Sequence, residues 1–120
     1  MQNNEKNLKQ RAYTYSINSI QLIDTLNKTS ISSQVIAKQL MRSATSVGAN
    51  IIEAQAGSTR KDFTNFFSYA LKSANESKFW LELLRDTGKA NKDKIELLVK
   101  ETDELSRMLG ASIITLRKKN

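Results

Sequence analysis

Apolar side chains recur at alternating steps of three and four residues through four segments of this 120-residue chain, and no proline interrupts any of them. The segments cover residues 8–26, 37–54, 63–84 and 95–116. This spacing places one apolar stripe along one face of an α-helix, whereas the alternation of a β-strand is sustained nowhere. Because proline would break or kink a helix, its absence allows each segment to form one continuous helix. We therefore predict an all-α protein of four helices, each with one core stripe.

Turn and capping residues separate the four segments. Gly57 and Gly88 stand where a left-handed residue would end a helix, and Thr59 and Asn91 are candidate N-caps of the helices that follow. The connections are short, which favours antiparallel neighbours. The sequence thus predicts an up-down-up-down antiparallel four-helix bundle that forms a single domain over residues 1–120.

The chain contains no Cys and no His. It therefore has no disulfide, no thiolate nucleophile, no Ser-His pair and no ordinary zinc or haem ligands. We expect no catalytic residues, no metal and no cofactor, and hence a protein that is not an enzyme. The longest uncharged stretch, residues 12–23, is broken by polar side chains, so we expect no membrane-spanning helix and no signal peptide, and a cytoplasmic location.

A flanking stripe runs beside the core stripe on the second and third helices. On the second helix it consists of small and polar residues, and on the third it carries three aromatic residues around a serine and a glutamate. From it we single out Ser46, Asn50, Glu53, Phe66, Tyr69, Ser73, Glu76 and Trp80, together with Arg42 on the outer side of the second helix. One interpretation makes these residues boundary positions of an overfilled core. The other makes them a surface for self-association, because exposed aromatic patches on small proteins usually lie at interfaces.

The same two helices carry sequence blocks that resemble a known family. The first block reads Gln39-Leu-Met-Arg42-Ser-Ala44-Thr-Ser46-Val-Gly-Ala49-Asn50-Ile51-Ile-Glu53-Ala. The second block runs from Lys61-Asp62-Phe63 through Ala70, Ser73 and Glu76 to Phe79-Trp80-Leu81. In this order they resemble the 23S ribosomal RNA intervening-sequence family of four-helix-bundle proteins.

The resemblance implies a homo-oligomer, because members of that family are similar to homopentamers, and some are encoded inside intervening sequences of ribosomal RNA genes. The family is also similar to the accessory variability determinant of diversity-generating retroelements, a basic pentamer that binds nucleic acid and partners a reverse transcriptase. A pentamer, a nucleic acid, and a reverse transcriptase or other protein partner are therefore implied. No biochemical activity is established for most of the family. Its polar motif positions are matched here by Arg42, Asn50, Glu53, Ser73 and Glu76.

These polar residues allow two interpretations. Asn50, Glu53 and Glu76 could form a site for acid-base or metal chemistry, but two carboxylates and an amide without His or Cys suit only Mg²⁺ or Ca²⁺. We favour the second interpretation, in which they fix helix register or subunit contacts, as polar groups inside bundles can do. Arg42 could pair with a glutamate across such a contact.

Positive charge is concentrated by the predicted topology. Nineteen Lys and Arg oppose twelve Asp and Glu, giving a net charge of +7. The start of the first helix, the second connection and the end of the last helix meet at one end of such a bundle. We call that end the basic end; it collects eight cations against Glu5 and Asp62, namely Lys6, Lys9, Arg11, Arg60, Lys61, Arg117, Lys118 and Lys119. The opposite end is closer to balance.

A concentrated basic end suits phosphate backbones, so we predict binding to RNA or DNA that is independent of sequence and weakened by salt. No RNA-recognition signature indicates sequence-specific readout. The first functional hypothesis is a non-enzymatic oligomeric module that holds nucleic acid or a nucleic-acid enzyme. The alternatives are a basic end that only aids solubility, and a structural protein–protein interaction bundle without a nucleic-acid role. A helical RNase of the toxin type is disfavoured because no His is present.

Overall fold

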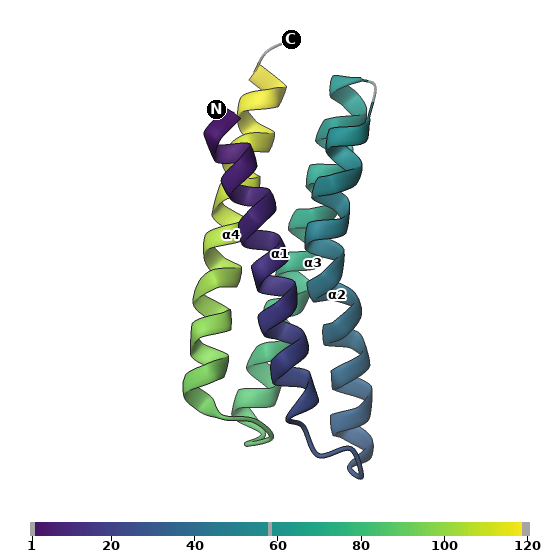
Figure 1. Cartoon of the computed structure of the whole chain (residues 1–120), viewed down its shortest axis with the longest axis vertical. Coiled ribbons are helices and arrows are strands. Elements are labelled where there is room, and N and C mark those ends of the chain that lie inside the picture. Colours follow the sequence, from purple (N-terminus) through teal and green to yellow (C-terminus); the bar gives the residue numbers. More distant parts are fainter. Residues whose placement is uncertain (1, 58, 119–120) are drawn as a thin grey trace.

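Four antiparallel helices make up the computed structural model, which describes residues 2–57 and 59–118, with side chains from residue 7 onward. The helices are α1 (Gln2–Asp24), α2 (Ile31–Ala56), α3 (Arg60–Asp86) and α4 (Lys92–Lys118). They run alternately up and down, so that the start of α1, the α2–α3 connection and the end of α4 lie at the same end (Figure 1). The predicted all-α up-down-up-down bundle is confirmed. Within the described ranges, none of the helices is long and apolar enough to cross a bilayer.

The helix ends follow the predicted caps with one exception. The Thr59 hydroxyl accepts a hydrogen bond from the backbone N–H of Asp62 at 3.0 Å, and the Asn91 side chain accepts one from the N–H of Lys94 at 3.0 Å. Gly88 has a φ of 67° and is the predicted left-handed residue after α3.

The left-handed cap predicted at Gly57 is wrong, because this residue is extended, with φ −68° and ψ 148°. Its backbone N–H donates to the carbonyl oxygen of Ala54 at 3.2 Å, so α2 ends in a tight turn that needs no left-handed residue. Glycine is favoured at this position because there is little space for a side chain. A Cβ at this position would lie 3.2 Å from the carbonyl oxygen of Ala54 and 3.2 Å from the Cβ of Asp62.

The core stripes predicted from periodicity are buried along most of their length. Leu40, Val47 and Ile51 of α2 and Leu81 and Leu84 of α3 are fully buried, and α4 contributes a similar row. Four stripe positions are only half-buried, namely Ala37, Phe63, Ser112 and Leu116. On α2 and α4 the neighbouring Ile36 and Ile113 are buried where Ala37 and Ser112 were expected. Burying such rows of apolar side chains is the main stabilising term for a bundle of this size.

A layer of five fully buried hydroxyl residues crosses the middle of this apolar core, and all four helices contribute to it: Tyr15 and Ser19 of α1, Ser43 of α2, Ser77 of α3 and Thr102 of α4. We call it the hydroxyl layer. The sequence pattern placed Tyr15, Ser19, Ser77 and Thr102 on the core stripes and Ser43 on the flanking stripe, and it did not indicate that they form one layer.

In this layer, the Tyr15 and Thr102 hydroxyl oxygens are 2.7 Å apart. Thr102 donates its one proton to the carbonyl oxygen of Leu98 at 2.6 Å, so Tyr15 is the donor of the shared bond. Burial raises the pKa of the Tyr15 phenol, and the hydroxyls of Thr102, Ser77 and Ser19 only partly offset this rise. The phenol therefore stays protonated and joins α1 to α4.

The other two helices are joined by serines. Ser77 Oγ and Ser43 Oγ are 2.9 Å apart, and both side chains are fully buried. Each serine also reaches a carbonyl oxygen of its own helix, Ser73 O at 2.8 Å and Leu40 O at 3.3 Å. Since serine is small, the backbones of α2 and α3 can approach closely at this level.

We predict that Tyr15 and Thr102 are energetically coupled. Thr102→Val leaves the buried Tyr15 hydroxyl without its acceptor and is expected to cost about 1–3 kcal/mol of unfolding free energy, while Tyr15→Phe costs about 1 kcal/mol. In the double variant both polar groups are gone, so its cost is expected to be about 1 kcal/mol less than the sum of the two. Urea unfolding of the four proteins measures this difference, and additive costs would contradict the coupling.

Candidate functional site

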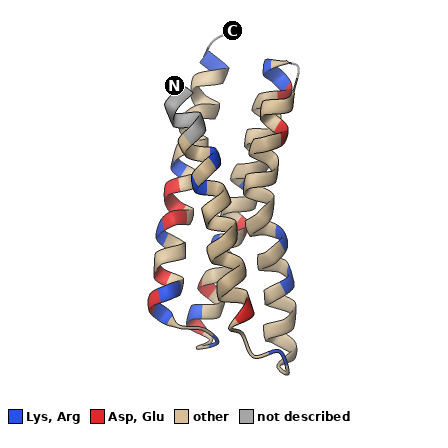
Figure 2. Ribbon diagram, in the orientation of Figure 1, with Lys and Arg blue, Asp and Glu red and all other residues tan. Residues whose placement is uncertain are grey.

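The basic end is formed by three separate segments of the chain. Lys9 lies on α1, Arg60 and Lys61 begin α3, and Arg117 and Lys118 end α4; all five are exposed. Figure 2 shows blue segments at the start of α3 and at the end of α4, on the same end of the bundle. The side chain of Lys6 and the whole of Lys119 lie outside the described residues. The topology thus brings together the described cations that the sequence analysis assigned to this end.

Two carboxylates also lie near this end. Asp62 is in the first turn of α3, where it complements the helix dipole. Glu53, which the sequence analysis did not include in the charge balance of this end, lies one turn before the end of α2 and is exposed. The local excess of positive charge is therefore smaller by one than the sequence count.

Arg11 differs from the other cations of the basic end because it is already engaged. Its guanidinium donates to Glu101 of α4 at 2.6 and 3.0 Å, and Glu104 lies 3.9 Å away. The hydrogen bond to Glu101 raises the pKa of Arg11, which is held as a cation against α4. Arg11 therefore ties α1 to α4 and contributes little positive potential to the end of the bundle.

At the opposite end, Arg85 is paired with nearby carboxylates. Arg85 is 2.8 Å from Asp86, 3.2 Å from Glu96 of α4 and 3.8 Å from Glu82. The hydrogen bond from Arg85 lowers the pKa of Asp86 below its ordinary value. Lys28, Lys89, Lys92 and Lys94 of this end make no ion pair with the residues that the structure describes, but they stand among Asp24, Glu82, Asp86, Asp93 and Glu96, so this end is closer to balance, as the sequence count predicted.

The flanking stripes of α2 and α3 meet in a polar contact on the surface. The guanidinium of Arg42 donates to Glu76 of α3 and to Gln39 of its own helix, the latter at 2.8 Å. The indole N–H of Trp80 donates to the same Glu76 carboxylate at 2.9 Å. Arg42 thus pairs with a glutamate as expected, but the pair joins two helices of one chain. Gln39 is the member that sequence reasoning did not single out, although it shares their spacing.

Three of the remaining polar residues form hydrogen bonds within their own helices, Ser46 and Asn50 through their side chains and Ser73 through its backbone carbonyl. The Ser46 hydroxyl donates to the Arg42 carbonyl at 2.6 Å, and the Asn50 amide donates to the Ser46 carbonyl at 2.8 Å. The carbonyl of Ser73 accepts from Ser77. The contacts that join α2 to α3 are instead the buried Ser43–Ser77 pair and the surface pair of Arg42 with Glu76. The residues of the described segments include no group of three carboxylates that could hold a metal ion.

Aromatic side chains on the outer face of α3 lie beside this polar contact. Tyr69 is 49% exposed and meets Phe66 edge to face, with ring centroids 5.8 Å apart. Phe79 is 54% exposed and meets Trp80 edge to face at 4.9 Å. Phe79 was not among the site residues predicted from sequence, because it falls outside the flanking stripe. We call Tyr69, Phe79 and Trp80 the aromatic face.

A family model for the 23S rRNA-intervening sequence protein matches residues 4–111. The chain belongs to this family. A solved structure supports the assignment: a protein of unknown function from the S23 ribosomal protein family of Bacteroides thetaiotaomicron VPI-5482 is 33% identical, with a TM-score of 0.80. The match covers 92% of this chain and 97% of that one. No match is found among curated proteins. For this intervening-sequence protein, the comparisons thus establish family and fold, and function must be argued from its surfaces.

We predict that Arg11 stabilises the bundle whereas its neighbour Lys9 does not. Arg11→Met keeps an aliphatic stem but removes the paired contact to Glu101, which is expected to cost about 1 kcal/mol of unfolding free energy. Lys9→Met, at an exposed position on the same helix, should change it by less than about 0.5 kcal/mol. Urea unfolding compares the two variants, and equal effects would contradict the assigned role of Arg11.

Proposed function

We propose that this intervening-sequence protein is a non-enzymatic module that binds nucleic acid through its basic end. The observation that carries the proposal is the convergence of unpaired cations from α1, α3 and α4 on one end, whereas the unpaired lysines of the opposite end stand among five carboxylates. Arg11, Arg42, Arg85 and Arg107 are each held by a carboxylate of the same chain. In contrast, Lys9, Lys61, Arg117 and Lys118 are exposed and have no carboxylate partner in the part of the chain that the structure describes.

Unpaired cations that converge from three segments suit a phosphate backbone. Each phosphate contact releases condensed counterions, which drives binding and makes it steeply dependent on salt. Tyr13 of α1 is 62% exposed and lies one turn from Lys9, and stacking of bases on an aromatic ring tolerates any sequence. The ligand is therefore RNA or DNA held by its backbone, without sequence preference.

Removing charge from the basic end is expected to weaken binding of a single-stranded RNA. In the variant Lys9→Gln/Lys61→Gln/Arg117→Gln, three phosphate contacts are lost. The slope of log Kobs against log salt should then become shallower by about 2, from roughly 0.7 per contact. Fluorescence anisotropy over a salt series measures both the affinity and the slope.

A matched variant tests whether the position of the removed charges matters, and not only their number. Lys28→Gln/Lys89→Gln/Lys92→Gln removes the same three charges from the α1–α2 and α3–α4 connections and the start of α4, at the opposite end. Its affinity should stay within about threefold of the parent protein, since net charge alone has only a weak screened effect at physiological salt. Equal losses in the two variants would contradict a localised site.

Self-association through the aromatic face is a second proposal. Tyr69 and Phe79 are half-exposed aromatic residues of α3, about three turns apart; Tyr69 contacts Phe66, and Phe79 contacts the half-buried Trp80. Aromatic residues of this kind form the centre of protein interfaces, and the family resemblance implies a pentamer. An oligomer would repeat the basic end and increase avidity for one nucleic-acid strand. The same face could instead receive a protein partner, such as the reverse transcriptase implied by the resemblance.

We predict that the protein is oligomeric at micromolar concentration and that Tyr69→Lys converts it to monomers, because a lysine cannot be buried at low cost in an apolar contact. Ile114→Lys is the control, since Ile114 is a similarly exposed apolar residue on α4. Light scattering after size exclusion gives the masses. A monomeric parent protein, or dissociation by Ile114→Lys alone, would refute this interface.

A further inference from the structure

The contact between α1 and α4 is closed along only half of its length. In the half nearer the basic end, Arg11 binds Glu101 and Tyr15 binds Thr102 across the two helices. Beyond Tyr15 toward the opposite end, α1 and α4 separate into a groove of about 310 Å³. Its lining residues come from these two helices alone: Asn18, Gln21, Leu22, Lys94, Leu97, Leu98 and Glu101.

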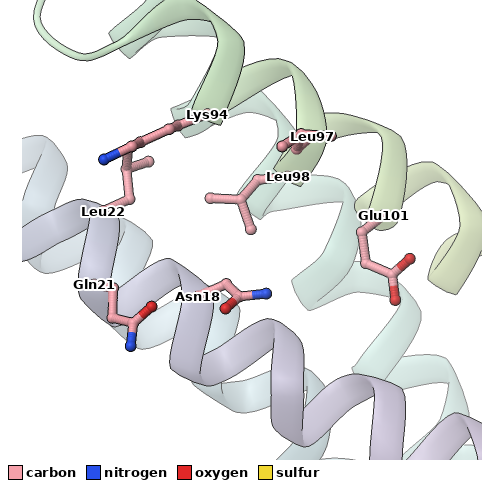
Figure 3. A pocket seen from close by; sticks show the side chains of 7 residues that line it. All are labelled: Asn18, Gln21, Leu22, Lys94, Leu97, Leu98 and Glu101. Carbon is pink, nitrogen blue, oxygen red and sulfur yellow. The ribbon is translucent and has the colours of Figure 1, made fainter.

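Three leucines make the apolar part of this groove. Leu22 and Leu98 are almost fully buried and form its floor, while Leu97 at the lip is 70% exposed. Figure 3 shows Leu22 reaching from α1 and Leu98 from α4 toward the space between the helices. A ligand with an apolar body that rests on this floor would cover Leu97 and so remove its exposed apolar surface from water.

Of the two charged side chains that line the groove, one is neutralised and the other is not. The Glu101 carboxylate is already neutralised by Arg11. Lys94, Asn18 and Gln21 form no hydrogen bond or ion pair between their side chains and any residue the structure describes. The groove therefore offers one unpaired ammonium and two carboxamides next to an apolar floor. Few convergent polar groups on a mostly apolar wall are typical of small-molecule sites.

We propose that this groove binds a small amphipathic carboxylate, with its apolar body over Leu22, Leu97 and Leu98 and its carboxylate at Lys94. The volume of about 310 Å³ is at the lower limit of ligand pockets, which suits a molecule the size of an amino acid or an arylalkanoate. It is too small for a docked helix, whose contact would extend over several turns. The site is independent of the basic end and of the aromatic face.

The probe for the test is 4-phenylbutyrate, and the readout is the methyl NMR spectrum of the full-length protein during titration. We expect saturable shifts that are largest for the methyl groups of Leu22, Leu97 and Leu98. The matched amine, 4-phenylbutylamine, should bind more weakly, because it places a cation near Lys94. Lys94→Gln should weaken binding of the carboxylate about three- to fivefold, as expected for one partly exposed ion pair.

Two further variants complete the test. Lys100→Gln removes an exposed lysine of α4 that does not line the groove and should leave the affinity unchanged. Asn18→Phe fills the groove from an exposed position and should abolish the leucine shifts while the rest of the spectrum stays folded. Absence of shifts at these leucines at millimolar probe, or equal affinity for the carboxylate and the amine, would overturn the proposal. Neither result bears on the proposal that the basic end binds RNA, which is tested separately.

Discussion

The small buried residues Ser77 and Ser43 let α2 and α3 approach closely in the middle of the bundle, and the hydrogen bond between them requires the two helices to keep one register. Both serines are fully buried, and their Oγ atoms are 2.9 Å apart. Larger side chains at these positions would hold the two backbones farther apart. At the same level, Tyr15 and Thr102 join α1 to α4. Buried hydroxyl pairs add little net stability, but an unpaired buried hydroxyl is costly, so such pairs favour one helix register over others.

This register determines which residues reach each surface. Once Ser43 faces Ser77, their neighbours Arg42 and Glu76 meet on the outside, and Trp80 joins them one turn later. On the other side of the bundle, the Tyr15–Thr102 bond and the Arg11–Glu101 pair close one half of the α1–α4 contact and leave the groove in the other half. The basic end depends on topology alone, because it collects the ends of three segments.

The fold could be predicted from sequence because helical periodicity and capping residues act locally. The stripes, the caps at Thr59 and Asn91 and the left-handed Gly88 all followed from such local rules. Features that depend on how two helices are rotated against each other could not be predicted. Arg11 was counted among the cations of the basic end, because its pairing with Glu101, ninety residues away in the chain, leaves no signal in the sequence. The groove had no sequence signal, since Leu97 and Asn18 belong to unrelated segments.

Binding of nucleic acid at one end of the bundle can be tested residue by residue by lysine-acetylation footprinting. The protein is acetylated with and without a saturating single-stranded RNA, and mass spectrometry gives the protection of each lysine. If nucleic acid binds at the basic end, RNA should protect Lys9, Lys61 and Lys118 and leave the reactivity of Lys28 and Lys89 at the other end unchanged. Equal protection at both ends, or protection confined to Lys28 and Lys89, would contradict binding at the basic end.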